Sequence, residues 1–298
     1  MIVFAGPGVA GAIRNQFNLV GNTVNSGATG GTEGGASGGG SAGADSATVQ
    51  AAIAKDAKDW TLDEQKAVAE DIAKNGTSSI AYAKAEAAMK AGTYWSVKLT
   101  DGTTMSYQII GINHDELEDG SGKAGLTFRA GCYGRAMGGQ RMNSTDTNLG
   151  GWEKSEIRAR LNSGELWSLL PSEMASKIKP VKKETCCQGG GKLGDPVTTV
   201  DKLFLLSLTE IYGPIKTGET EGARFDGGQY EYFVDRGVSD SKGGMDGARA
   251  WNTNWLRSVT WTASNAVKVM HFYENVYNGI YSTDPASSKI SVNPAWCF

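Results

Sequence analysis

Two histidines and four cysteines are the residues of this 298-residue chain that could carry nucleophilic chemistry. A Ser-His-Asp or Cys-His arrangement needs a histidine as its base, so His114 or His271 would have to serve. Neither lies in a recognisable motif, and Cys297 lies among apolar residues, where thiols are usually inert. Two carboxylates could converge for glycoside hydrolysis, but no spacing points to a particular pair. We therefore expect that the protein is not an enzyme.

Residues 6–11 match the G-x-G-x-x-G pattern of dinucleotide-binding proteins and follow the apolar residues 2–4. A Rossmann unit also needs a second strand and an acidic residue about 20 positions further on. At that distance the chain is rich in glycine, with Glu33 as the nearby acid. The context therefore disfavours a nucleotide cofactor.

An acidic stretch contains one of the two histidines: His114-Asp115-Glu116 is followed by Glu118 and Asp119. Calcium tolerates irregularly spaced oxygen ligands, but the EF-hand pattern is not present in the sequence. We expect a solvated loop and no cofactor, with a calcium site as the alternative.

The composition argues against several function classes. The net charge is −3 and the basic residues are dispersed, which gives little support to nucleic-acid binding. No apolar run reaches 18 residues, so no membrane span is expected. The apolar start, residues 1–13, is short, lacks a cationic leader and is broken by glycine and proline. We therefore do not expect a secretory signal.

The four cysteines, Cys132, Cys186, Cys187 and Cys297, show no C-x-x-C spacing. Adjacent cysteines cannot easily bridge each other, and a domain of this size does not need disulfides. We expect free thiols, with a bridge from Cys132 to Cys186 or Cys187 as the alternative.

The C-terminal segment has the composition of a contact surface. Of the 40 residues from Asn252 to Ser291, 18 are Asn, Ser, Thr or Tyr. Tyrosine supplies rigid contact area, and serine and asparagine supply adaptable hydrogen bonds. An apolar frame brackets the segment: Trp255 and Leu256 before it, and Val292, Pro294, Trp296 and Phe298 after it. The candidate ligand-binding residues are Trp261, Asn265, Lys268, His271, Tyr273, Asn275, Tyr277, Asn278 and Tyr281.

Arg257 lies at the edge of the same segment, next to the apolar frame. We expect a buried structural arginine that binds loop carbonyls or a carboxylate. A clamp for an anionic ligand is the alternative.

Four parts are predicted along the chain. Residues 1–26 form a small attachment or oligomerisation segment. Residues 27–45 form a flexible linker, because glycine dominates and offers no apolar surface for a core. Residues 46–92 are helical, and residues 93–298 form the ligand-binding domain.

The predicted fold class is α+β: short helices beside a twisted, mainly antiparallel sheet with long loops. Thr61 and Glu64 fit a capping box for a helix that buries Val68 and Ile72 and ends at residues 75–76. A β-hairpin is predicted over 95–112, with Asp101-Gly102 as a two-residue turn. Further helices are predicted at 46–58, 78–92, 152–161 and 172–179, and further strands at 124–128, 202–208, 229–233, 254–257, 266–272 and 289–293.

Seven motifs in order resemble an uncharacterised domain family that is common in prophages and in surface proteins of gut bacteria. The motifs occupy residues 151–158, 161–162, 169–171, 181–183, 201–207, 255–258 and 292–295. That family is similar to the C-type-lectin fold, which formylglycine-generating enzymes and the variable proteins of diversity-generating retroelements also use. The resemblance covers about residues 94–298.

The resemblance implies a C-type-lectin-like domain whose last fifty or so residues form a variable face. Diversification at adenine-containing codons yields Asn, Ser, Thr, Tyr, Asp and His, the bias of this segment. The sulfatase-activating activity does not carry over, because no matching cysteine pair is present.

The resulting expectation is a phage receptor-binding protein on the virion. Residues 1–26 would attach it to other virion proteins or build a homo-oligomer, with a trimer favoured. The ligand would be a bacterial surface protein or glycan. The alternatives are a bacterial cell-surface adhesin, a structural virion decoration protein and a hydrolase or oxidase.

Overall fold

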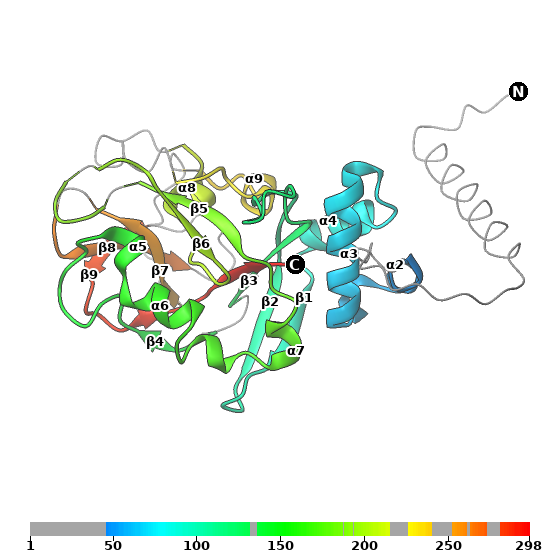
Figure 1. Ribbon diagram of the computed structural model, residues 1–298, viewed down its shortest axis with the longest axis horizontal. Helices are drawn as coiled ribbons and strands as arrows, with labels where there is room; N and C mark the ends of the chain where they lie inside the picture. Colours follow the sequence, from blue (N-terminus) through cyan, green and yellow to red (C-terminus); the bar gives the residue numbers. More distant parts are fainter. Residues whose placement is uncertain are drawn as a thin grey trace, which may run out of the picture. The chain divides into compact units, whose positions relative to one another are not determined.

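The capping box at Thr61 begins a helix in the computed structural model of the protein (Figure 1). Thr61 Oγ1 accepts the Glu64 N–H at 3.2 Å, and the Glu64 carboxylate accepts the Thr61 N–H at 2.7 Å. This helix, α3 (Leu62–Asn75), buries Val68 and Ile72 and ends at Gly76, whose φ is 54°. The predicted start, buried face and end of this helix are confirmed.

The structure describes residues 46–131, 136–186, 188–192, 194–214, 226–239, 252–260, 263–272 and 281–298. At residues 46, 252, 268–272 and 281 it describes the backbone alone. The predicted attachment segment, residues 1–26, and the predicted linker, residues 27–45, lie outside the described residues. The chain from Ala44 to Phe298 forms one compact unit.

The other helices before the sheets are shorter than predicted. The helix expected at 46–58 is divided into α2 and a 3-10 turn, η1. The helix expected from residue 78 begins after a second 3-10 turn, because the Ser79 hydroxyl accepts the Ala81 N–H and so holds an extra turn. It ends at Gly92, as predicted. The bounds are α2 (Ser46–Ile53), η1 (Ala57–Asp59), η2 (Gly76–Ser78) and α4 (Tyr82–Ala91).

A four-stranded antiparallel sheet contains the predicted hairpin and the end of the chain. Its strand order is β1-β2-β3-β11. The hairpin is confirmed, but its turn is longer than predicted: the Leu99 N–H binds the Thr103 carbonyl, and Gly102 has a φ of 87°. This is a three-residue loop closed by a left-handed glycine. The strands are β1 (Tyr94–Lys98), β2 (Thr104–Ile112), β3 (Leu126–Ala130) and β11 (Ala295–Cys297).

A second sheet has the strand order β4-β10-β7-β8-β9, and a two-stranded sheet pairs β5 with β6. The pairs β7–β8 and β8–β9 are antiparallel, whereas β10 and β7 are parallel. The strands expected at 254–257, 266–272 and 289–293 correspond to β7, β8 and β10. The bounds are β4 (Gly139–Gln140), β5 (Val181–Thr185), β6 (Val197–Asp201), β7 (Asn252–Val259), β8 (Ala266–Phe272), β9 (Tyr281–Pro285) and β10 (Ile290–Ser291).

Aromatic rings fill the core of the first sheet. Trp296, near the end of the chain, stacks on Phe128 and meets Tyr107 edge to face, with centroids 5.9 and 5.2 Å apart. The Tyr107 hydroxyl donates to Gln65 of α3 at 3.1 Å. A side chain at Gly125 would collide with the Ala69 carbonyl of α3, so glycine lets the helix approach the sheet closely.

The remaining helices are short. The helix predicted at 152–161 breaks at Ser155, whose hydroxyl accepts the Arg158 N–H and starts a second helix; Ile157 and Leu161 are buried as expected. Of the helix predicted at 172–179, only the first turn forms. The bounds are α5 (Gly151–Lys154), α6 (Glu156–Asn162), η3 (Trp167–Leu169), α7 (Ser172–Ala175), α8 (Leu208–Tyr212) and α9 (Glu231–Asp235).

Two predicted strands are wrong. The segment 202–208 is not one of the strands and leads into α8, which begins with a capping box formed by Ser207 and Glu210. The strand expected at 229–233 lies mostly in α9, where Tyr232 and Phe233 are both buried. A short apolar run fits a strand and a buried helical turn equally well. The strand expected at 124–128 lies two residues further on, as β3.

The predicted α+β class with antiparallel sheets is confirmed. In the described part of the chain, no helix combines the length and the apolar character that a membrane span requires.

Candidate functional site

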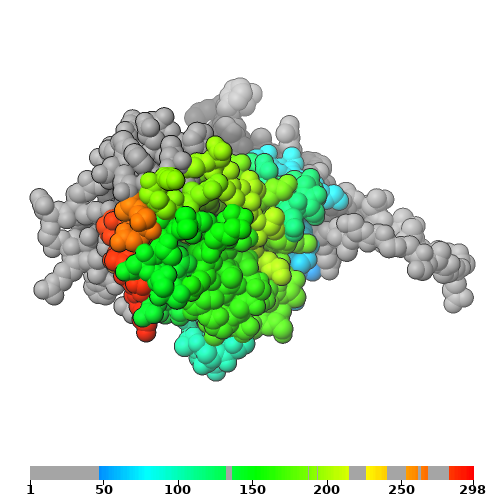
Figure 2. Space-filling model, turned by 60° about the vertical axis from the view of Figure 1, so that its left-hand side comes forward, coloured from blue at the N-terminus to red at the C-terminus, as the bar shows by residue number. Residues whose placement is uncertain are grey.

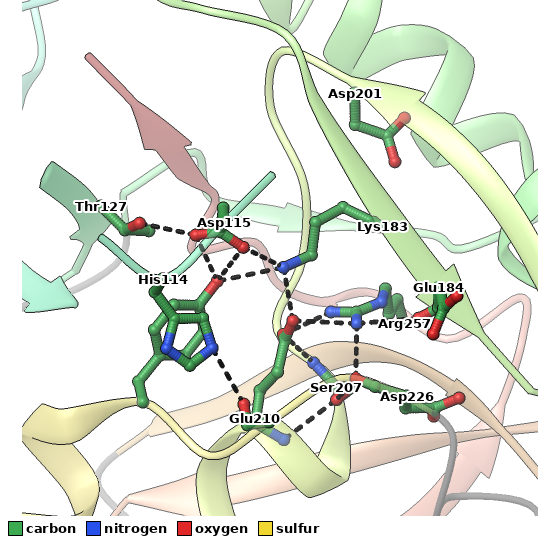
Figure 3. A network of polar contacts seen from close by, with 12 residues as sticks. His114, Asp115, Thr127, Lys183, Glu184, Asp201, Ser207, Glu210, Asp226 and Arg257 are labelled. Atoms are coloured by element: carbon green, nitrogen blue, oxygen red, sulfur yellow. Dashed lines mark hydrogen bonds and ion pairs between the residues drawn. The ribbon is translucent and has the colours of Figure 1, made fainter. Parts of the chain in front are cut away.

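A buried ionic network joins all three sheets and two helices. At its centre is Lys183 of β5, whose ammonium donates to Asp115 at 2.6 Å and to the Tyr230 hydroxyl at 3.1 Å, and pairs with Glu210 at 2.5 Å. Figure 3 shows Lys183 between the two carboxylates. These three contacts use the three N–H donors of the ammonium group.

Asp115 follows β2 and accepts several further hydrogen bonds. Thr127 of β3 donates to it at 2.6 Å, and the Tyr230 hydroxyl donates to both its oxygens at 3.0 Å. The Cys297 thiol of β11 lies 3.5 Å from the same carboxylate. The expectation of a solvated acidic loop at 114–119 is therefore wrong for Asp115, whose exposed fraction is 4%.

Arg257 of β7 is fully buried and extends the network to α8. Both terminal nitrogens of its guanidinium bind the Glu210 carboxylate, with Nη2 at 3.0 Å, and Nε donates to Thr185 Oγ1 at 3.1 Å. The carbonyls of residues 184, 205 and 226 also lie within hydrogen-bond distance of Nη1 or Nη2. The prediction of a structural arginine that binds carbonyls and a carboxylate is confirmed.

The protonation states follow from burial and pairing. Burial opposes ionisation of Asp115, but the charge of Lys183 outweighs it, and the Asp115 pKa falls to about 2. Burial likewise opposes the charge of Lys183, yet Asp115 and Glu210 raise its pKa. The pKa of Glu210 is lowered, because Arg257 and Lys183 outweigh its burial. Two carboxylates and two cations thus balance each other.

Asp226 would add an unbalanced fifth charge to this neutral set. It is 1% exposed and accepts hydrogen bonds from the Cys186 N–H and the Ser258 hydroxyl. Burial raises its pKa to about 6, although Arg257 acts in the opposite direction. Ionised Asp226 is therefore disfavoured in the folded protein below about this pH.

The states of Lys183, Asp115 and Glu210 do not suit nucleophilic or acid–base chemistry. Lys183 is held as an ammonium ion, and Asp115 and Glu210 are held as carboxylates whose oxygens are occupied. Burial and the nearby Asp115 raise the pKa of the Cys297 thiol well above its usual value, so its reactive thiolate is suppressed. Neither Cys186 nor Cys297 forms a disulfide, in agreement with the prediction, whereas Cys132 and Cys187 lie outside the described residues.

His114 lies at the edge of the network. Its ring stacks on Tyr230 with centroids 4.0 Å apart, Nδ1 lies 3.3 Å from a Glu231 carboxylate oxygen, and Nε2 lies 3.1 Å from the Gly228 carbonyl. Both nitrogens face acceptors, so only the imidazolium form can donate to both. Burial lowers the pKa of His114, but the hydrogen bond to Glu231 and the charge of Asp115 raise it overall.

An open cavity of about 270 Å³ lies above the network. Its walls include Asp115, Lys183, Glu210 and Arg257 together with the backbone of Gly227 and Gly228. Among the described residues, no group of three or more His, Cys, Asp or Glu side chains could hold a metal ion. Asp115, Lys183, Glu210 and Arg257 satisfy one another in this lining, which also includes Glu116, Lys182, Glu184 and Thr198.

The apolar frame predicted around the contact segment is buried. Trp255 and Leu256 are each 2% exposed, and Val292, Pro294, Trp296 and Phe298 are buried as well. Among the described residues between these two anchors are the strands β8, β9 and β10.

The candidate ligand-binding residues are described only in part. Asn265 is exposed in the loop between β7 and β8, and its carbonyl accepts the Ala286 N–H at 2.9 Å. Lys268 pairs with Thr283 of β9, His271 pairs with Thr253 of β7, and Tyr281 pairs with Met270 in the backbone register. Trp261, Tyr273, Asn275, Tyr277 and Asn278 lie outside the described residues.

The sequence interpretation named Arg257 correctly and placed Asp115 in a solvated loop, but it missed Lys183, Glu210, Asp226 and Tyr230. Lys183 lies in a strand whose inward positions are Val181, Lys183 and Thr185, so no apolar alternation marks it. Glu210 did carry a signal, because Ser207 and Glu210 have the spacing of a capping box, the pattern that located α3.

A family model described as "Domain of unknown function (DUF6273)" matches residues 121–297. This range includes the candidate contact segment and the members of the ionic network on β5, α8 and β7, whereas His114 and Asp115 precede it. No curated protein and no solved structure shows significant similarity to the chain.

Proposed function

This chain belongs to the DUF6273 family, and we propose that it is a non-enzymatic ligand-binding protein whose contact surface lies on the β7–β8–β9 sheet and its loops. The finer architecture that we propose is C-type-lectin-like. In support of this, the last strand, β11, returns to pair with β3, and a second sheet carries long connections. Loops carried by a rigid sheet are a frequent location of binding sites.

The observation that carries the proposal is the contrast between a fixed frame and the exposed positions it holds. Arg257 anchors β7 through side-chain and carbonyl contacts, while Trp296 anchors β11 in the aromatic core. Ser264 and Asn265 are exposed in the intervening loop. Residues there can change without loss of the core, which suits a replaceable binding face.

The chemistry of the ionic network supports a binding rather than a catalytic role. Its carboxylates and cations satisfy one another, and the thiol of Cys297 is held protonated. A catalytic group needs both a pKa near the working pH and a free contact with substrate. Asp226, with a pKa of about 6, meets the first condition, but it is 1% exposed and its carboxylate binds the Cys186 N–H and the Ser258 hydroxyl.

The proposed setting is the virion of a phage, with a protein or glycan of the bacterial surface as the ligand. The glycine-rich residues 27–45 would act as a tether and residues 1–26 as the attachment or oligomerisation segment, with a trimer favoured. Tethering several copies raises the effective concentration, so weak single contacts suffice.

The proposal is tested with the full chain, fluorescently labelled, against a panel of gut bacterial strains. We expect saturable labelling of some strains. A variant with Asn265→Ala, Tyr273→Ala and Tyr277→Ala should lose the labelling and keep its melting temperature. Cells that have bound and released the protein should bind a second sample equally, because a binding protein leaves its receptor unchanged.

The matched control is Tyr94→Ala with Lys98→Ala, two exposed positions of β1 in the other sheet. This variant should label cells as the parent does. Failure to label any strain, or full labelling by the triple variant, would contradict the proposal. A lasting loss of binding sites on treated cells would favour an enzyme instead.

A further inference from the structure

His114 joins two parts of the chain that meet at the cavity. It lies just after β2, whereas its two acceptors, the Gly228 carbonyl and the Glu231 carboxylate, belong to the segment that leads into α9. The side chain of His114 is 14% exposed. In Figure 2 the yellow atoms, which belong to this segment, lie at the surface beside green parts of the chain. A single imidazole thus ties a surface segment to the end of a buried strand.

Gly227 and Gly228 form an exposed turn in the wall of the cavity. Gly227 has a φ of 95°, and a side chain there would lie 3.1 Å from the Glu210 carboxylate, so the turn lies directly against the ionic network. Neither glycine has a side chain with which to hold the turn in place. The Gly228 carbonyl instead lies 3.1 Å from Nε2 of His114. The position of this wall therefore depends on a contact that titrates.

The chain is anchored on both sides of the glycine turn. Before it, the Asp226 carbonyl accepts hydrogen bonds from Arg257 at 2.8 Å and from the Ser207 hydroxyl at 2.7 Å. After it, the Tyr230 N–H binds the Glu210 carbonyl at 3.0 Å. Loss of the imidazole contact would therefore free the turn alone and leave the ionic network assembled.

A neutral imidazole carries one N–H and cannot serve both acceptors. A carboxylate is a stronger acceptor than a carbonyl, so the remaining proton of a neutral His114 stays on Nδ1, which faces Glu231. The second carboxylate oxygen of Glu231 is buried and has no hydrogen-bond partner among the described residues, which adds to its demand for this proton. Nε2 then turns a lone pair toward the Gly228 carbonyl, and the contact that held the turn becomes repulsive.

The groups that face the His114 ring set the pH at which this happens. Burial lowers the pKa of His114, and Lys183 of β5 acts in the same direction, but Glu231 of α9 and the neighbouring Asp115 raise the pKa above its ordinary value of 6.5. The Tyr230 ring stacks on the imidazole and offers its π face to the cation. The contact with the turn is therefore complete below pH 6.5 and is lost as the pH rises through the folded pKa of His114.

We propose that His114 is a pH-dependent latch for the Gly227–Gly228 turn: the imidazolium holds this wall of the cavity against the ionic network, and the neutral ring releases it. The inference concerns access to the cavity and does not rest on the proposed contact surface. Because Lys183 and Arg257 stay paired with the carboxylates beneath the turn, release opens the cavity without dismantling the network.

The test follows the ring and the turn separately, by NMR of the full chain from about pH 5.5 to about 8.5, a range that spans the ordinary histidine value. The chain has two histidines, so a His114→Gln sample identifies the His114 ring signals. On deprotonation the ring nitrogen shifts should show the proton on Nδ1. The order parameter of the Gly228 Cα should fall from about 0.85 to below about 0.6 in the same pH range, while that of the Tyr230 Cα should stay high.

Glu231→Gln tests the link between ring and turn in a protein that keeps His114. It removes the negative charge but retains an amide oxygen at the same position. The pKa of His114 should fall, and the pH at which Gly228 becomes mobile should fall by the same amount. The matched control is Glu156→Gln, because Glu156 also begins a helix, α6, but accepts its hydrogen bond from Ser144. This control should shift neither transition.

Asp226 also titrates in this range, with a pKa of about 6, so the measurement is repeated in Asp226→Asn, where the transition of the turn should persist. Its disappearance there would assign the pH response to Asp226 and overturn the latch. A turn that stays rigid while the His114 ring titrates, or one that is mobile at every pH, would overturn it as well. So would a neutral ring with its proton on Nε2, because Gly228 would then keep its donor.

Discussion

The ionic network and the loop over residues 260–266 are both organised by a single buried polar residue, but in opposite ways. Lys183 meets charged side chains from several elements, so its contacts hold the sheets to one another. Asn148 meets backbone carbonyls of one loop, so its contacts fix a shape whatever side chains the loop carries. The comparison separates residues that hold the fold together from residues that present a surface.

Glu210→Ala should give the largest effect, because it breaks the network at the carboxylate that Lys183 and Arg257 share. Removing one partner of a buried ion pair leaves an uncompensated charge and costs about 3 to 5 kcal/mol of unfolding free energy. Urea unfolding followed by circular dichroism measures it. The whole domain should lose stability, including regions far from residue 210.

The matched control is Glu165→Ala, which removes an exposed carboxylate that pairs with Arg160. An exposed pair contributes at most about 1 kcal/mol. Equal losses in the two variants would mean that the buried network does not hold the fold together, and the contrast with the loop would fail.

Asp226→Asn tests whether ionisation of the Asp226 carboxyl is disfavoured in the folded protein. The folded pKa of Asp226 is about 6 against an ordinary value of 3.8, so protonation favours the folded state. That stabilisation is complete below pH 3.8 and is lost as the pH rises through 6. One pKa unit corresponds to about 1.4 kcal/mol, so the asparagine variant should gain about 3 kcal/mol relative to the parent between pH 3.5 and 8.

Urea unfolding of the parent and of Asp226→Asn at each pH gives the difference between their unfolding free energies. The contributions of the other titrating groups are the same in both proteins and cancel in this difference. Asp195→Asn, an exposed position between β5 and β6, controls for the loss of one carboxylate. A constant difference between Asp226→Asn and the parent at all pH values would show that Asp226 is ionised freely in the fold.

The two regions also differ in how far the sequence predicts them. The apolar frame, the hairpin and α3 follow from alternation and capping, because their buried positions are apolar or capped. Strands β5 and β6 escaped prediction because Lys183, Thr199 and Asp201 occupy inward positions, so their pattern resembles that of a surface segment. Hydrophobic periodicity cannot reveal a strand whose core side is polar.

The same reason explains the error at Asp115. A run of acids beside a histidine is typical of a solvated loop, and only the partners Lys183 and Tyr230, distant in sequence, make burial of this carboxylate possible. Arg257 could be predicted as buried because apolar residues flank it. The contacts by which Asn148 fixes the β7–β8 loop could not be predicted, since the acceptors of its side-chain amide are backbone carbonyls more than 100 residues away in the sequence.

Asn148→Ala should give the smallest and most local effect. It removes the donor to three loop carbonyls and the acceptor of the Gly190 N–H, and we expect a loss of about 1 to 3 kcal/mol. Hydrogen exchange should accelerate in peptides that cover 188–191 and 263–266 but not in α3, and binding to labelled cells should weaken. Asn162→Ala is the matched control, because Asn162 also binds backbone groups on both sides of a loop, at residues 158, 202 and 203.

The control should lose similar stability while exchange at 263–266 and cell binding stay unchanged. If Asn148→Ala instead accelerated exchange throughout the domain, Asn148 would belong with the ionic network as a residue that holds the fold together. The distinction between the two regions would then disappear, because loop shape and global stability would depend on the same contacts.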